Sequence, residues 1–361
     1  MRLAWFRPAT QVSDRLDDTA ALISAWGTEH EIEVFDEARA HDFIRLDFRA
    51  PFDLCIFELA DSVQHAFVWP YLLHVPGVLR LRSLSLHESR TQALRRQHRE
   101  GDRVRELAFG DWDLVTAPIL ASRMTVVSDA HAAGRLQRDF PAACVRHAPL
   151  GVGWGQAGDR PGPDPGLTPI VGASRNGVVS RAFARARDEG ARIDLLIGTP
   201  DEILDKADII VATSWPPADE STIALAGMAS GRPVIVLETE TTAAWPALDP
   251  QTWQPRGWTD QAPIVVSIDP RDEEHSLSLA LRRLANETAL RETLGSAAHA
   301  WWQRHATLDH ASTAWRSILA EAATMSPPPR PDNWPSHLTA DGTGRARELL
   351  GEFGAAVDFL T

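Results

Sequence analysis

Residues 51–90 read PFDLCIFELADSVQHAFVWPYLLHVPGVLRLRSLSLHESR, and their pattern decides the fold. Two short apolar runs, at 54–57 and 78–81, are separated by a polar loop, a helical stretch and a Pro-Gly break. Apolar runs of this length that are joined through a helix predict a βαβ unit with parallel strands. The stretch therefore indicates an α/β protein.

Polar side chains follow the two predicted strands at the edge where open α/β sheets bind their ligands. His65, Arg82 and His87 lie in or beside the loops after these strands. Arginine can bind an anionic group, and histidine can bind a hydroxyl group or act as a base. A histidine in a loop is more often a simple polar surface residue, so both interpretations stay open.

The same alternation of apolar runs and helical patterns continues along the chain in two series. The first series predicts strands at 3–6, 32–35, 54–57, 78–81, 114–117, 124–127 and 145–147, and helices at 16–26 and 89–106. The second predicts strands at 169–172, 193–197, 208–212, 233–237 and 264–268, and helices at 178–188, 221–229, 273–286, 288–305 and 310–323. Strands spaced by helices predict parallel sheets.

The chain divides into two Rossmann-like parallel-sheet domains that we expect to face each other across a cleft. Residues 1–154 form the first, residues 169–325 the second, and the Gly- and Pro-rich stretch 155–168 links them. A tail, 326–361, starts with an extended PPPRP motif and contains an amphipathic pattern at 343–353. We expect this tail to pack back on the body of the protein.

Composition excludes several classes of function. The net charge of −13 over 361 residues argues against a nucleic-acid partner. No apolar run approaches the roughly 18 residues of a transmembrane segment, and the first residues lack a signal-peptide pattern. We therefore expect a cytoplasmic protein, and peripheral contact with a membrane stays open. Cys55 and Cys144 lie in apolar runs, which favours buried free thiols over a disulfide.

One candidate anion site opens a helix in the second series. Glu220, Ser221 and Thr222 precede the apolar stretch IALAGMAS. The two hydroxyl groups can cap the helix, and the free N–H groups there favour an anion such as a pyrophosphate. The Glu220 carboxylate could accept hydrogen bonds from a ribose. An ordinary capped helix explains the same residues.

A second candidate follows the first strand of the second series, in IVGASRNGVVSRAF. Gly172 and Gly177 would let backbone approach a ligand, and Arg175 and Arg181 could meet a phosphate. The segment is no GxGxxG fingerprint, so dinucleotide binding has weak support. A strand-to-helix turn with solvated arginines is the alternative.

An arginine-dense run, RTQALRRQHREGDRVR at 90–105, places Arg95, Arg96, Arg99 and Arg103 on one face of the predicted helix. A solvated helix face is the default interpretation. Attraction to anionic lipid or to a phosphorylated acceptor is the alternative.

Several stretches in the same order resemble the retaining family-four glycosyltransferases, which have the GT-B fold, and within them a bacterial subgroup. The stretches are 41–78, SWPPADES at 214–221 with ALAGMASGRPVIV at 224–236, ALDPQTW at 247–253, 272–295 and 335–360. The resemblance implies transfer of a sugar from a nucleotide-sugar to an unknown acceptor with anomeric retention, in surface polysaccharide or glycolipid assembly. It implies no metal and no cofactor, since positive groups and helix N-termini offset the charge of the leaving diphosphate.

The resemblance also implies where the substrates lie. The second domain would hold the donor through Gly172, Arg175, Arg181, Glu220, Ser221 and Thr222. The first domain would place His65, Arg82 and His87 on the acceptor side. A retaining reaction leaves little for a protein base to do, so no catalytic residue is assigned.

The chain departs from the family at chemically important positions. These are Asp14 for a loop glycine, Arg82 and Ser83 for a His-Asp pair, Ala173 and Val178 for a basic pair, and Gly227 or Met228 for a second glutamate. The second half also lacks about one strand-helix unit after residue 194. An active transferase and a catalytically inactive GT-B relative, acting as a scaffold or partner subunit, are therefore both carried forward. A small-molecule oxidoreductase is a weaker hypothesis, because the glycine fingerprint is missing.

Overall fold

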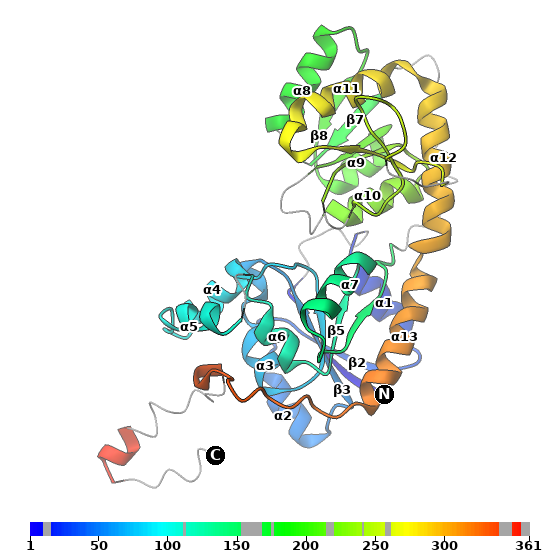
Figure 1. Ribbon diagram of the computed structural model, residues 1–361. Coiled ribbons are helices and arrows are strands. Elements are labelled where there is room, and N and C mark those ends of the chain that lie inside the picture. Colours follow the sequence, from blue (N-terminus) through cyan, green and yellow to red (C-terminus); the bar gives the residue numbers. More distant parts are fainter. Residues whose placement is uncertain are drawn as a thin grey trace.

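The computed structural model describes residues 1–9, 16–110, 113–152, 168–174, 177–213, 220–239, 242–256, 261–338 and 349–354. For Glu220 and Ser221 it describes the backbone alone. Within these ranges the chain forms two parallel six-stranded sheets flanked by helices, one above the other in Figure 1. The α/β class and the two-domain parallel architecture predicted from the sequence are confirmed.

The first sheet has the order β2-β1-β3-β4-β5-β6. Its strands are β1 (Arg2–Phe6), β2 (Glu31–Phe35), β3 (Leu54–Leu59), β4 (Val78–Leu81), β5 (Met124–Val127) and β6 (Val145–His147). Side chains alternate between its faces, so Trp5 and Ile56 enter one core while Phe6 and Phe57 enter the other. This alternation determines which side chains of the sheet each layer of helices covers.

Helices cover both faces of the first sheet. They are α1 (Asp18–Trp26), α2 (Asp42–Arg49), α3 (Val68–His74), α4 (His87–Arg96), α5 (Asp102–Phe109), α6 (Thr116–Ala121) and α7 (Ala130–Asp139), with a 3-10 turn η1 (Val63–His65). The Phe6 face packs against α3, α6 and α7, and the Trp5 face packs against α1.

The second sheet has the order β11-β12-β10-β9-β7-β8. Its strands are β7 (Ile170–Ala173), β8 (Asp194–Ile197), β9 (Ile209–Ala212), β10 (Val234–Leu237), β11 (Ala247–Leu248) and β12 (Val265–Ile268). Its helices are α8 (Gly177–Asp188), α9 (Pro200–Lys206), α10 (Glu220–Ala229), α11 (Glu273–Asn286) and α12 (Thr288–His305), with a 3-10 turn η2 (Pro270–Asp272). The chain passes from β8 through α9 directly to β9, and β8 is an edge strand. The two-residue β11, which the sequence did not predict, extends the other edge.

The last long helix, α13 (Leu308–Thr324), returns to the first domain after α12 (Figure 1). Trp315 is buried with Trp5 and Trp26, at ring-centroid distances of 6.0 and 6.3 Å. Trp26 Nε1 donates to Ser312 Oγ at 2.7 Å. The sequence placed this helix in the second domain, whereas in the structure it completes the core of the first.

Two local predictions are wrong. Residues 114–117 form no strand: Leu114 has φ 61° and α6 begins at Thr116. The single helix predicted at 89–106 is two helices, because His98 has φ 54° between α4 and α5. A left-handed residue interrupts the hydrogen-bond ladder of a helix, so the arginines from Arg95 to Arg103 share no continuous face.

Part of the tail packs back on the first domain. A 3-10 turn, η3 (Ser336–Leu338), buries Leu338, and Trp334 meets the Phe109 ring edge-on at 5.5 Å. Residues 349–354 leave Phe353 83% exposed, and the rest of the amphipathic pattern at 343–353 lies outside the described residues. The linker 155–168 lies outside them too, except for its last residue. Among the described helices, none combines the length and apolar character needed to cross a membrane.

Candidate functional site

A cluster of charged side chains lies buried at the carboxyl edge of the first sheet, where α1 begins. We call it the buried ion cluster; its members are Arg7, Asp17, Asp18, Thr19, Glu58, Arg80 and Arg82. Glu58 on β3 and Arg80 on β4 are register partners, so their side chains lie on the same face of the sheet. Asp18 comes from the first turn of α1, which covers that face.

The two strand arginines share the same carboxylates. Arg82 Nη1 lies 2.9 Å from Asp18 Oδ1 and 3.1 Å from Glu58 Oε1. Arg80 pairs with Asp18 and lies 3.6 Å from Glu58 Oε2. Thr19 Oγ1 donates to Glu58 Oε2 at 2.8 Å. The two carboxylates therefore have several hydrogen-bond donors each, which a buried charge requires.

The cluster is electrically balanced. Burial by itself raises the pKa of Asp18, but the guanidinium groups of Arg80 and Arg82 outweigh burial and lower that pKa to about 2. The pKa of Glu58 is lowered as well, against the effect of its burial, by Arg80 and Arg82. Arg7 is neutralised by Asp17, whose Oδ2 lies 2.6 Å from Arg7 Nη2. The cluster is therefore ionised at neutral pH without a surplus of positive charge.

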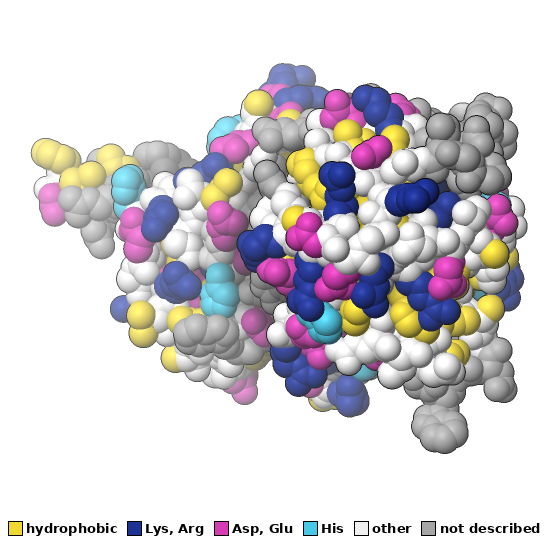
Figure 2. Space-filling view, turned by 90° about the horizontal axis from the view of Figure 1, so that it is seen from above, with side chains coloured by type: hydrophobic (Ala, Val, Ile, Leu, Met, Phe, Trp, Pro, Cys, Tyr) yellow, Lys and Arg dark blue, Asp and Glu magenta, His cyan; other side chains and the backbone are white. Residues whose placement is uncertain are grey.

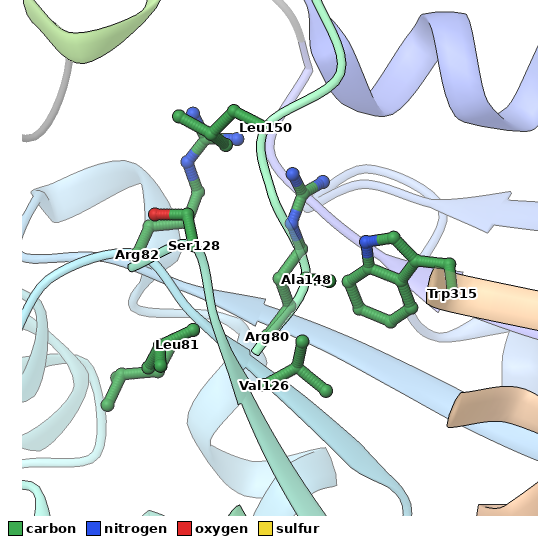
Figure 3. A pocket seen from close by; sticks show the side chains of 9 residues that line it. Arg80, Leu81, Arg82, Val126, Ser128, Ala148, Leu150 and Trp315 are labelled. Carbon is green, nitrogen blue, oxygen red and sulfur yellow. The ribbon is translucent and has the colours of Figure 1, made fainter. Parts of the chain in front are cut away.

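A small cavity of about 20 Å³ opens beside the cluster (Figure 3). Arg80, Arg82, Ser128, Leu150 and Trp315 line it, and Arg80 Cζ lies 5.6 Å from the centre of the Trp315 ring. The volume suffices for about one water molecule. Among the three arginines of the cluster, Arg82 is the most accessible, with 17% of its side chain exposed.

The N-terminus of α1 is already occupied by acidic groups. The Asp17 carboxylate accepts a hydrogen bond from the backbone N–H of Ala20 at 2.9 Å, and Asp18 lies in the same turn. A second anion at this helix end would meet both carboxylates. The start of α1 is thus a poor place for a phosphate.

The predicted acceptor-side histidines lie in two segments that the structure joins. The Asp61 carboxylate, in the loop after β3, accepts from the backbone N–H of Glu88 at 2.5 Å and of Ser89 at 3.2 Å. This contact fixes the loop that carries His65 against the start of α4, which carries His87. Asp61 was not predicted as a site residue. It caps α4 from a loop 27 residues earlier, so no N-cap residue next to the helix marks the contact in the sequence.

Each histidine has a neighbour in its own domain. His65 Nδ1 lies 2.9 Å from Ser62 Oγ, and His87 Nδ1 lies 3.3 Å from Arg103 Nη2. Arg82 turns instead toward Asp18 and Glu58 on the other face of the sheet. The structure therefore brings the two histidine segments together and draws Arg82 into the buried ion cluster.

The predicted donor-side residues have more diverse environments. Gly172 lies inside the sheet, where a Cβ would come within 2.6 Å of Ile203 Cγ2 and of Ala207 Cβ, so its position is explained by the packing of α9. Gly177 begins α8 with φ 34°. Arg181 is 60% exposed in its side chain and pairs with Glu274 of α11 at 2.5 Å.

Three of the remaining donor-side candidates, Glu220, Ser221 and Thr222, begin α10, which lies on the side of the second domain that faces the first (Figure 1). Thr222 is buried in its first turn. The side chains of Glu220 and Ser221 and all of Arg175 lie outside the described residues. Gly227 stands in α10 where the family resemblance implies a second glutamate. A Cβ at Gly227 would lie 3.0 Å from Ile210 Cγ1 and from Val234 Cγ2, so close packing explains the glycine.

Charges of both signs are interspersed on the face shown in Figure 2, with no extended basic patch. No group of three or more His, Cys, Asp or Glu side chains in the described ranges could hold a metal ion. Most residues of the buried ion cluster were not predicted from the sequence. A signal was available, because Glu58 and Arg80 are single charges inside the apolar strands LCIFEL and VLRL.

Comparisons with known proteins connect this architecture to glycosyltransferases. No protein-family model matches the sequence, and no curated protein matches it either. The structure of Anabaena HepE in complex with UDP and glucose matches with a TM-score of 0.59 at 11% identity, covering 89% of this chain and 100% of HepE. Sucrose-phosphate synthase from Thermosynechococcus elongatus matches with a TM-score of 0.58 at 12% identity, covering 89% and 98%.

WaaG, a glycosyltransferase involved in lipopolysaccharide biosynthesis, matches with a TM-score of 0.53 at 12% identity, covering 88% of this chain and 99% of WaaG. At such identities the likeness concerns the fold alone. The chain has the GT-B fold that these neighbours share.

Proposed function

We propose that the protein is a glycosyltransferase that takes its sugar from a nucleotide-sugar. The supporting observation is the extent of the structural match, which covers 89% of this chain and all of HepE. HepE has been crystallised with UDP and with UDP-glucose. A nucleotide diphosphate-sugar, with a uridine nucleotide tested first, is therefore the substrate class that we assign to this fold.

The finer assignment rests on the sequence. The stretches at 41–78, 214–236 and 335–360 resemble family-four enzymes and their bacterial subgroup, which supports anomeric retention and a role in surface polysaccharide or glycolipid assembly in the cytoplasm. The first domain would hold the acceptor and the second the donor. In this proposal neither a metal nor a cofactor takes part.

The donor would lie against the N-termini of α8 and α10. The backbone N–H groups of the first turns, at Gly177 and at residues 220–222, would face the diphosphate, and Arg181 lies one turn into α8. His65 and His87 would meet the hydroxyl groups of the acceptor. Arg82 would reach the departing diphosphate only after turning away from Asp18 and Glu58, a movement that its 17% exposure permits.

A catalytically inactive relative is the second candidate, and one observation favours it. Arg82 is paired with Asp18 and Glu58, and Arg181 is paired with Glu274. Each positive group must therefore leave a carboxylate before it can stabilise a diphosphate. A preorganised hydrogen-bond donor is worth roughly 100- to 1000-fold in rate, so a slow transferase or a scaffold would both follow from these pairs.

Calorimetric titration with UDP, UDP-glucose, GDP-mannose, ADP-glucose and dTDP-glucose tests the proposal. We expect saturable heat from at least one compound at about 1 mM, and a loss of about tenfold in affinity for Glu220→Ala. Glu100→Ala, on the first domain, is the matched control and should bind as the parent does. Absence of heat from all five compounds would overturn the assignment. Binding without release of nucleoside diphosphate over many hours would favour the inactive relative.

A further inference from the structure

A second and larger cavity lies in the first domain, apart from the buried ion cluster. Its volume is about 430 Å³, and its described lining comes from Leu84 in the loop after β4, from residues 109–110, 113 and 115–116 where α5 leads to α6, and from the end of α7. Sites for small molecules in proteins typically enclose about 300–1,000 Å³. None of the residues that line this cavity is among the positions that the family resemblance points to.

The walls combine aromatic and acidic side chains. Phe109 and Phe140 supply apolar surface, and Asp113, Thr116 and Asp139 supply carboxylate and hydroxyl groups. Arg135 Nε lies 3.6 Å from Asp139 Oδ2, at the long limit for an ion pair. Among the described lining residues, two carboxylates stand against one guanidinium, and this excess of negative charge disfavours an anionic ligand.

The protein holds this wall in a strained but fixed conformation. Leu114, next to Asp113, has φ 61° although it is no glycine, and it is 5% exposed. The Asp113 carbonyl accepts a hydrogen bond from the Leu86 N–H at 2.9 Å. A Cβ at Gly110 would lie 2.5 Å from Thr116 Cβ, so the approach of these two residues requires glycine. Strain of this kind persists only where the surroundings fix it, often at ligand sites.

The tail supports the same wall from behind. Trp334 packs edge-on against Phe109, whose ring lines the cavity. His337, three residues after Trp334, has its Nε2 atom 2.9 Å from the buried carboxylate of Glu106, three residues before Phe109. The aromatic wall is thus held in place before any ligand binds, which lowers the entropy that binding costs.

We propose that this cavity binds an uncharged saccharide. A sugar ring presents apolar C–H faces, which suit the phenyl and leucine walls, and hydroxyl donors, which suit Asp113, Asp139 and Thr116. A purely apolar chain would cover the polar groups of Asp113 and Thr116 without offering them a hydrogen bond, and a sugar phosphate would meet the negative charge of the two carboxylates. The inference rests on the cavity alone and does not depend on the proposed transfer reaction.

Ligand-observed NMR on the full-length protein with maltose, cellobiose, lactose and sucrose tests the inference. We expect saturable binding of at least one sugar at about 20 mM, weakened about tenfold by Asp113→Asn. Asp139→Asn serves as a second variant in case Asp113→Asn impairs folding. Asp201→Asn, on the second domain, is the matched control and should bind as the parent does.

Three results would overturn the inference. The first is no saturable signal from any of the four sugars, and the second is binding that survives both cavity variants. The third comes from a parallel titration with glucose and glucose 6-phosphate: selective binding of the phosphorylated sugar would contradict the charge argument. Failure of nucleotide binding in the calorimetric experiment would leave this inference intact, because the two sites share no residue.

Discussion

At the residue scale, Asp18 makes stability depend on pH. Its pKa of about 2 in the folded protein is below the ordinary value of about 3.9, so folding is favoured by the ionised form. This contribution, about 2 kcal/mol, is complete above the unfolded-state pKa and is lost as the pH falls toward 2. We expect the free energy of unfolding, measured in urea, to decline between about pH 5 and pH 2.

Asp18→Asn separates this effect from general acid denaturation. It leaves Arg80 and Arg82 with Glu58 as their shared carboxylate and should cost about 3–5 kcal/mol at pH 7. The variant should also show a shallower decline on acidification, while Asp188→Asn, at the exposed end of α8, should behave as the parent does. An unchanged pH profile in Asp18→Asn would contradict the assignment of the low pKa.

Gly172 gives a test of packing against ligand binding. We expect Gly172→Ala to cost about 1–3 kcal/mol in unfolding free energy, because the new methyl group meets Ile203 and Ala207 in a filled core. Gly134→Ala is the control: it lies within α7 with open space around it and should stabilise by about 0.5–1 kcal/mol. A Gly172→Ala protein of full stability that fails to bind nucleotide would show that the glycine serves the ligand instead.

The site was less predictable than the fold for a physical reason. His65, Arg82 and His87 could be placed at one sheet edge, because the alternation of strand and helix settles where loops fall. Which way Arg82 turns depends on Asp18, 64 residues earlier, and on a strand register that only packing decides. Local patterns carry no information on such pairs.

At the element scale, three segments meet at one buried carboxylate. Glu106 on α5 pairs bidentately with Arg90 of α4 and contacts His337 of η3, and each of these residues is less than 10% exposed. His337→Ala leaves the pair with Arg90 intact, so it should cost only about 1–2 kcal/mol while releasing the tail. Hydrogen exchange followed by mass spectrometry should show faster exchange confined to residues 334–338.

His131→Ala, on the exposed start of α7, is the control for that experiment and should leave exchange in the tail unchanged. Faster exchange throughout α4 and α5 in His337→Ala would mean that the histidine supports the whole domain. Unchanged exchange at 334–338 would mean that Trp334 and Leu338 suffice to hold the tail.

Strands and long helices were predictable from the sequence, whereas the elements that depend on distant partners were not. The apolar runs at 78–81, 124–127 and 145–147 are strands with those bounds, and α11 and α12 begin and end where their periodicity does. The apolar run at 114–117 is ambiguous by itself. It begins with the left-handed Leu114 and leads into the buried helix α6, because tertiary packing overrides the intrinsic preference of so short a segment.

At the scale of the whole molecule, the first domain is completed by the far end of the chain. Trp315, Ile318 and Leu319 of α13 share one core with Leu3 and Trp5. Ion pairs at the surface support this return, with Arg316 Nη2 2.7 Å from Glu29 and Arg146 Nη2 2.5 Å from Glu321. The folding of the first domain is therefore coupled to a helix that follows the whole of the second.

This coupling predicts that a fragment of residues 1–152 will not fold stably. Without α13 it would expose Trp5 and Trp26, and burial of each large apolar side chain contributes about 1.5–3 kcal/mol, against a total domain stability of only about 5–15 kcal/mol. Near-ultraviolet circular dichroism and proton NMR should show little fixed tertiary structure.

Joining residues 307–338 to this fragment through a Gly-Ser linker should restore dispersed NMR signals and a cooperative urea transition. The same joined protein with Trp315→Ala should lose about 3–5 kcal/mol in unfolding free energy, because the substitution would open a cavity beside Trp5 and Trp26. A cooperative transition in residues 1–152 alone would contradict the coupling and would make α13 a cover for a core that is already complete.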